Sequence, residues 1–116
     1  MTWLWLSAAC MVTTAAVHSL LGYRRLVGPL LRRREGPWAD AMTRRIIRFA
    51  WHATSVLMLI SAAAIAWPGT PTTLLIVIGG GWLATGLFNA AHTMGRHIAW
   101  PALSGAGIFA LIGALA

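Results

Sequence analysis

The sequence predicts an all-α integral membrane four-helix bundle with both termini on the non-cytoplasmic side (N-out/C-out). Of its 116 residues, 59% are hydrophobic and only 9% are charged, whereas a soluble domain of this size carries about a quarter charged residues. The chain also contains four apolar segments, each close to the roughly 20 residues that a helix needs to cross a bilayer. We therefore expect a single transmembrane domain over residues 1–116.

Clear breaks separate the four expected spans. A basic loop at 22–45 follows the first span, a Pro-Gly-Thr-Pro turn at 68–71 follows the second, and a Gly-Arg-His corner at 95–97 follows the third. The first span is not expected to be a cleaved signal peptide, because its basic cluster follows the apolar stretch instead of preceding it. The expected spans are residues 2–21, 46–67, 72–94 and 98–116.

The arginine distribution predicts the orientation. The chain has no lysine; eight of its nine arginines lie between Arg24 and Arg48, and the ninth is Arg96. Because short Arg-rich loops stay in the cytoplasm, the termini and the turn at 68–71 are expected outside, in a bacterial inner membrane. The net charge of +7 is then a sign of topology and not of nucleic-acid binding, and it attracts anionic lipids by about 1 kcal/mol per Arg.

Polar residues follow one face of each of the first three spans, at helical steps of three and four. Such residues normally face the bundle interior or a partner, because they are costly in lipid. These three stripes are Ser7, Met11, Thr14 and His18; Arg45, Arg48, His52 and Ser55; and Thr85, Asn89, His92 and Arg96.

All four histidines fall at one depth along these stripes. His18, His52 and His92 each lie four residues inside the cytoplasmic boundary, which is roughly 6 Å at the helical rise. His97 lies at that boundary. Neutral imidazole binds transition metals and haem iron, so His18, His52, His92 and His97 are predicted metal or b-type haem ligands.

Three further residues, Asn89, Arg48 and Arg96, complete the candidate cofactor-binding site. Arg48 and Arg96 are expected to bind an anionic headgroup, a quinone or haem propionates. Covalent haem is excluded because no Cys-x-x-Cys-His is present. Alternatively, the histidines hydrogen-bond across the bundle and hold the helices together, and the arginines are interfacial anchors.

Two functions from different classes remain open. The first is electron transfer, or metal or cofactor handling, at the cytoplasmic face. The second is a non-catalytic accessory subunit of a larger membrane complex, such as a respiratory or photosynthetic assembly, or a homo-oligomer, with the Gly-rich helix faces packing on a neighbour. A small multidrug-type transporter is disfavoured, because such proteins resemble one another in a first-helix Glu that this chain lacks. No catalytic residue is predicted.

Three strings resemble a set of small four-helix bacterial inner-membrane proteins of uncharacterised function. The resemblance covers most of the chain and implies the helix count, but it implies no activity. The strings are Val17-His18-Ser19-Leu20-Leu21-Gly22, Arg48-Phe49-Ala50-Trp51-His52-Ala53-Thr54-Ser55 and Gly95-Arg96-His97-Ile98-Ala99-Trp100-Pro101.

Overall fold

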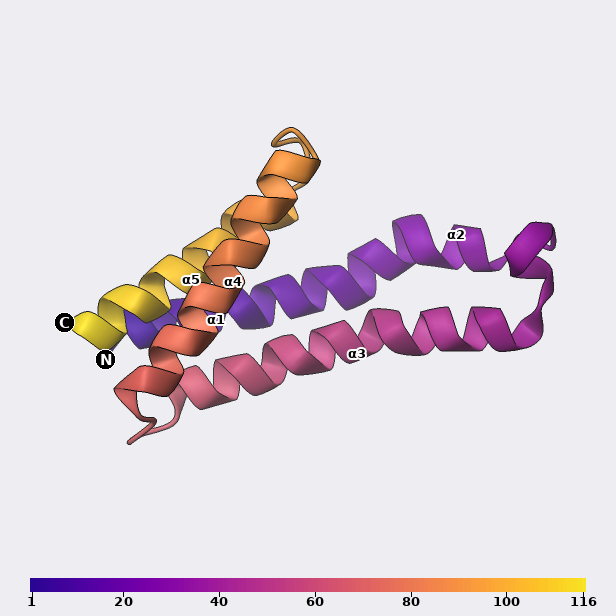
Figure 1. The fold of residues 1–116 in the computed structure, drawn as a ribbon. Coiled ribbons are helices and arrows are strands. Elements are labelled where there is room, and N and C mark those ends of the chain that lie inside the picture. Colours follow the sequence, from indigo (N-terminus) through magenta and orange to yellow (C-terminus); the bar gives the residue numbers. More distant parts are fainter.

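The structure, a computed structural model of residues 1–116, has four helices and no strands, which confirms the expected helix count (Figure 1). The first helical unit runs without interruption through three segments, and a short 3₁₀ turn, η2 (Gly36–Ala39), precedes the second. The elements are α1 (Thr2–Ala16), the π-helix η1 (Val17–Val27) and α2 (Gly28–Leu31), then α3 (Ala41–Ala66), α4 (Thr72–His92) and α5 (Ala99–Leu115).

The helix ends follow from local chemistry. The Asp40 carboxylate caps α3 by accepting from the Thr43 backbone N–H and hydroxyl, at 2.8 and 2.7 Å. The turns at 68–71 and 93–98 each contain a glycine with positive φ, Gly69 at 84° and Gly95 at 71°, a conformation that only glycine adopts without a steric penalty. These two breaks lie where the sequence predicted them.

The basic segment differs from the expected loop at 22–45, because most of it is helical. The first helix continues to Leu31 and α3 already begins at Ala41, so only residues 32–40 connect them. Burial explains the extension: Val27 and Leu31, one turn apart, are each only 4% exposed. The segment before Pro29 is a π-helix, in which the Gly28 N–H bonds to the Tyr23 carbonyl five residues back. This wider geometry also helps the helix to accommodate Pro29.

The helices pack in the order α3, α1, α5, α4, and α3 and α4 scarcely touch (Figure 1). Both termini lie at one end, where the Trp3 and Phe109 rings are 5.8 Å apart. From that end the α1–α3 pair and the α4–α5 pair diverge, and α1–α2 with α3 extends well past the other two helices. The arrangement is therefore open on the side between α3 and α4.

Small residues bring α5 close to its neighbours. A Cβ on Gly107 would lie 2.6 Å from the Gly79 carbonyl oxygen, and a Cβ on Gly86 would lie 2.6 Å from the Ser104 backbone nitrogen. On the α1 side, the fully buried Ser7 hydroxyl donates to the Ala106 carbonyl at 2.6 Å. These contacts agree with the expectation that small residues pack helices together.

The core is small for a chain of this length. Only 19 of 116 residues are buried, and the principal cluster consists mainly of Ala, Met and Leu from α1, α3 and α5. Large apolar side chains are exposed along every long helix. Three helices, Thr2–Leu31, Ala41–Ala66 and Thr72–His92, are long and apolar enough to cross a membrane, and Ala99–Leu115 is a shorter apolar helix.

Candidate functional site between the first and third helices

The first contact of the candidate site is a reciprocal pair formed by His18 of η1 and Trp51 of α3. Their rings stack with centroids 3.9 Å apart and planes 14° apart. His18 Nε2–H donates to the Trp51 carbonyl at 3.0 Å, and Trp51 Nε1–H donates to the His18 carbonyl at 2.9 Å. Gly22 leaves room for the indole, because a Cβ there would lie 2.8 Å from Trp51 Cζ2.

A chain of hydroxyl groups forms the second contact. Ser19 Oγ lies 3.0 Å from His52 Nδ1 and donates to Ser55 Oγ at 2.5 Å, and Ser55 in turn donates to the Ala15 carbonyl at 3.3 Å. Because the single Ser19 proton goes to Ser55, Ser19 accepts from His52 Nδ1–H. The direction of this relay assigns the proton of neutral His52 to Nδ1.

Tyr23 extends the site toward the arginine-rich end. Its ring centroid lies 5.0 Å from that of His52, and its hydroxyl accepts from Arg48 Nε at 3.0 Å. Arg48 and His52 are one turn apart on α3, so one tyrosine from η1 contacts both. Three members of the predicted α3 stripe, Arg48, His52 and Ser55, thus contact the first helix, whereas Arg45 is exposed and has no side-chain hydrogen bond.

The structure places the remaining predicted residues at the α4–α5 corner. His97 Nδ1 lies 3.3 Å from Asn89 Oδ1. His92 is exposed and stacks on Phe88, with ring centroids 5.6 Å apart. Arg96 is exposed, with no side-chain hydrogen bond.

The structure divides the four histidines between two places. His18 and His52 are bonded within the contact between η1 and α3, whereas His97 lies beside Asn89 and His92 lies against Phe88. The structure contains no group of three or more His, Cys, Asp or Glu side chains placed to hold a metal ion. Of the four predicted ligands, His18 and His52 are the two that lie in the same pair of helices.

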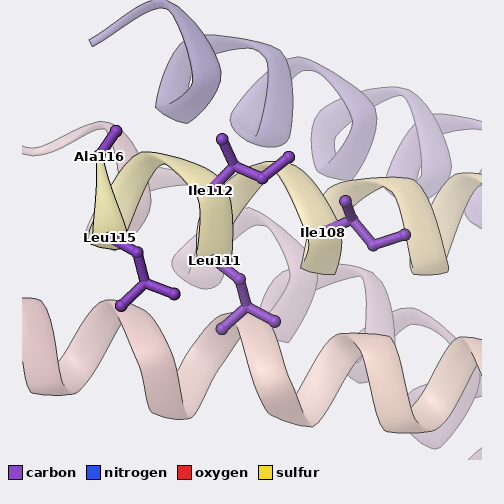
Figure 2. A pocket seen from close by; sticks show the side chains of 5 residues that line it. All are labelled: Ile108, Leu111, Ile112, Leu115 and Ala116. Carbon is purple, nitrogen blue, oxygen red and sulfur yellow. The ribbon is translucent and has the colours of Figure 1, made fainter.

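Two grooves of the molecule lie away from these histidines. One, of about 410 Å³, is lined only by apolar residues of α5 and the following Ala116, and Figure 2 shows Leu111 and Leu115 directed toward α4. The other, of about 240 Å³, lies between α3 and α4. Its lining combines apolar and polar residues: Ser61, Val77, Ile78, Gly81, Trp82 and Thr85.

The sequence stripes identified His18, His52 and Ser55 but missed Trp51, Ser19 and Tyr23. Trp51 lies outside the polar stripes because its side chain is mostly apolar, yet its indole N–H is bonded to the neighbouring helix. The available signal was the adjacency of His18 to Ser19 and of Trp51 to His52, which gives each helix two polar contacts at one level.

Comparison with known proteins adds no assignment: no family model, curated protein or solved structure matches this chain.

Proposed function

We propose that the chain is a multi-pass protein of a bacterial inner membrane, with all four helices spanning it and both termini outside. Three spans are long and apolar enough, and the 17 residues of α5 would cover about 26 Å. All nine arginines lie in the two connections remote from the termini or in the end turns of the helices that flank the first of them, as the positive-inside rule requires. A reporter enzyme fused after Ala116 should be active only outside the cytoplasm; cytoplasmic activity would refute this orientation.

Within that membrane, we propose a non-catalytic accessory subunit that binds its partner through α4. The observation that carries this proposal is a set of small and polar residues on the outward face of α4, among them Gly81 and Thr85, which border the groove that α3 does not fill. Neither Gly80 nor Gly81 has any atom within 4 Å of an added Cβ, and Thr85 and His92 on the same helix are exposed.

A neighbouring protein helix suits this face better than lipid does. Small residues allow a second backbone to approach closely, which is how helices associate in a bilayer. Asn89 uses only its carbonyl oxygen, toward His97, so its amide N–H groups remain available to a partner. Polar side chains at membrane depth normally face protein, because exposing them to lipid costs free energy.

Two matched glycine substitutions test the proposal. Gly81→Leu and Gly80→Leu both place a side chain into open space, but successive residues point about 100° apart around the helix, and only Gly81 lines the groove. Blue-native electrophoresis of a mild detergent extract should show a complex that Gly81→Leu abolishes and Gly80→Leu preserves. A wild-type chain that migrates only as a small free species would refute the proposal, and a band containing only copies of this chain would identify a homo-oligomer.

A second candidate function, cofactor or metal binding, is favoured by the hydrogen bonds of His18 and His52. Each imidazole donates one ring N–H to a protein acceptor, which leaves His18 Nδ1 and His52 Nε2 as free lone pairs. Histidine ligands of metals are typically oriented by such a donation from the second nitrogen. Two histidines on neighbouring helices also suit a b-type haem.

Gentle purification followed by an absorption spectrum and elemental analysis tests this candidate. A Soret band or stoichiometric metal should be present in the wild type, lost in His52→Ala and retained in His92→Ala. If the wild-type protein carries neither, the histidines act only to hold α1 against α3.

A further inference from the structure

The α1–α3 pair carries a basic extension that exceeds what crossing a membrane requires. The first helical unit has 30 residues and α3 has 26, or about 45 and 39 Å, against a hydrocarbon core of about 30 Å. The excess lies at the arginine-rich end, where the two helices run side by side past α4 and α5 (Figure 1). We call residues 23–48 the arginine hairpin.

Most of this charge has no counter-ion in the chain. The hairpin contains eight arginines and only two carboxylates, Glu35 and Asp40, so at least six of its arginines are not neutralised internally. The Asp40 carboxylate is occupied in capping α3 through Thr43. The counter-charges of the arginine hairpin must therefore come from outside the protein.

Arg48 differs from the other hydrogen-bonded arginines in the part of its side chain that remains free. Arg34 and Arg44 each use a terminal nitrogen to donate to backbone carbonyls of the connection. Arg48 instead donates only through Nε, to the Tyr23 hydroxyl. Both terminal nitrogens of Arg48 stay free, which is the fork that binds a phosphate bidentately.

The fork of Arg48 is also positioned by two helices. Tyr23 comes from η1 and its ring lies against His52 of α3, which is itself held by Ser19. A guanidinium oriented in this way loses less side-chain entropy on binding than a free one.

The surroundings of Arg48 favour a lipid as the source of the phosphate. Large apolar side chains are exposed at the same level, with Leu26, Ile46 and Phe49 at 54, 58 and 74%. A soluble anion would leave these side chains in water, whereas acyl chains would cover them while the phosphate meets the guanidinium. We propose that Arg48, oriented by Tyr23, binds the phosphate of an anionic phospholipid at the arginine-rich face. This inference rests on the proposed membrane location, but it is independent of the α4 partner and of the histidine cofactor.

Native mass spectrometry of the full chain in detergent, titrated with phosphatidylglycerol or phosphatidylcholine, tests the proposal. Wild type should bind the first phosphatidylglycerol preferentially, and Arg48→Gln should weaken that binding about tenfold, as expected for a lost charge-assisted pair. Arg33→Gln removes the same charge from an exposed residue without a side-chain bond and should weaken it far less. Tyr23→Phe keeps every charge but should still weaken the binding of phosphatidylglycerol, because it removes the hydroxyl that orients the Arg48 guanidinium.

Three outcomes would overturn the proposal. Equal losses in Arg48→Gln and Arg33→Gln would mean a diffuse attraction without a site. Unchanged binding in Tyr23→Phe would remove the positioning role of the hydroxyl. Full competition by inorganic phosphate, with no preference between the two lipids, would identify free phosphate as the ligand. Far-UV circular dichroism of each variant should match wild type, and Tyr23→Phe still tests the site if an arginine variant fails to fold.

Discussion

Removing one hydroxyl from the Ser19–Ser55 relay should loosen the α1–α3 contact by an amount that the structure allows us to estimate. Ser19→Ala deletes two interhelical hydrogen bonds, the one from His52 and the one to Ser55. Ser55→Ala also deletes two, the one from Ser19 and the one to the Ala15 carbonyl. Interhelical hydrogen bonds in membranes average about 0.6 kcal/mol each, so either variant should lose about 1–2 kcal/mol of unfolding free energy.

Thr54→Ala is the matched control for Ser55→Ala. The Thr54 hydroxyl donates to the Ala50 carbonyl within its own helix, a bond that survives when the helices separate. Its loss should therefore cost less than about 0.5 kcal/mol. The assay is an SDS titration in mixed micelles followed by tryptophan emission, with the free energy of unfolding extrapolated to the native detergent.

The double variant provides the sharper test. Ser19→Ala and Ser55→Ala share one hydrogen bond, so their combined cost should fall short of the sum of the single costs by about 0.6 kcal/mol. Strict additivity would mean that the two hydroxyls do not interact. A Thr54→Ala cost equal to that of Ser55→Ala would likewise refute the relay.

Three more predictions concern helix contacts and ends. Gly107→Ala should destabilise the protein by about 1–3 kcal/mol, because the added Cβ would lie 2.6 Å from the Gly79 carbonyl oxygen. Gly105→Ala is the control: its Cβ would come no closer than 4.0 Å to Phe109, so the same titration should show no destabilisation. Gly95→Ala should cost about 1 kcal/mol because φ is 71° there; an unchanged midpoint would contradict this. Hydrogen bonds from the Thr43 hydroxyl, and then from the Thr43 backbone N–H, lower the pKa of the Asp40 carboxyl. The stabilisation that this cap gives to α3 is therefore fully present above the ordinary carboxyl pKa and is lost as the pH falls through the lowered pKa. The hydrogen-exchange protection factors of the first turn of α3 should therefore fall in acid in wild type, and those of Asp40→Asn should not change with pH in this way.

The sequence predicted the helix count and the turns well, because both depend on local properties. Composition, apolar length and the Gly and Pro positions are sufficient to place the breaks at 68–71 and 95–97. The extent of the first helix could not be predicted in the same way. Arg24 and Arg25 mark the end of an apolar span, but they do not end a helix, and the burial of Val27 and Leu31 continues it to the connection at residue 32.

The histidine layer separates into two parts for a related reason. The depth of His18, His52 and His92 follows from the sequence through the rise per residue, but their lateral positions depend on which helices pack together. Gly86 and Gly107 allow α4 and α5 to pack closely, and the His18–Trp51 pair holds η1 against α3. Because α3 and α4 make few contacts, histidines at a common depth lie on two diverging pairs of helices. Within the first pair, side-chain contacts run without a break from Ser55 through Ser19, His52 and Tyr23 to Arg48. In such a chain, the helix pairs that small residues and hydrogen bonds select decide which residues of a common depth form one site.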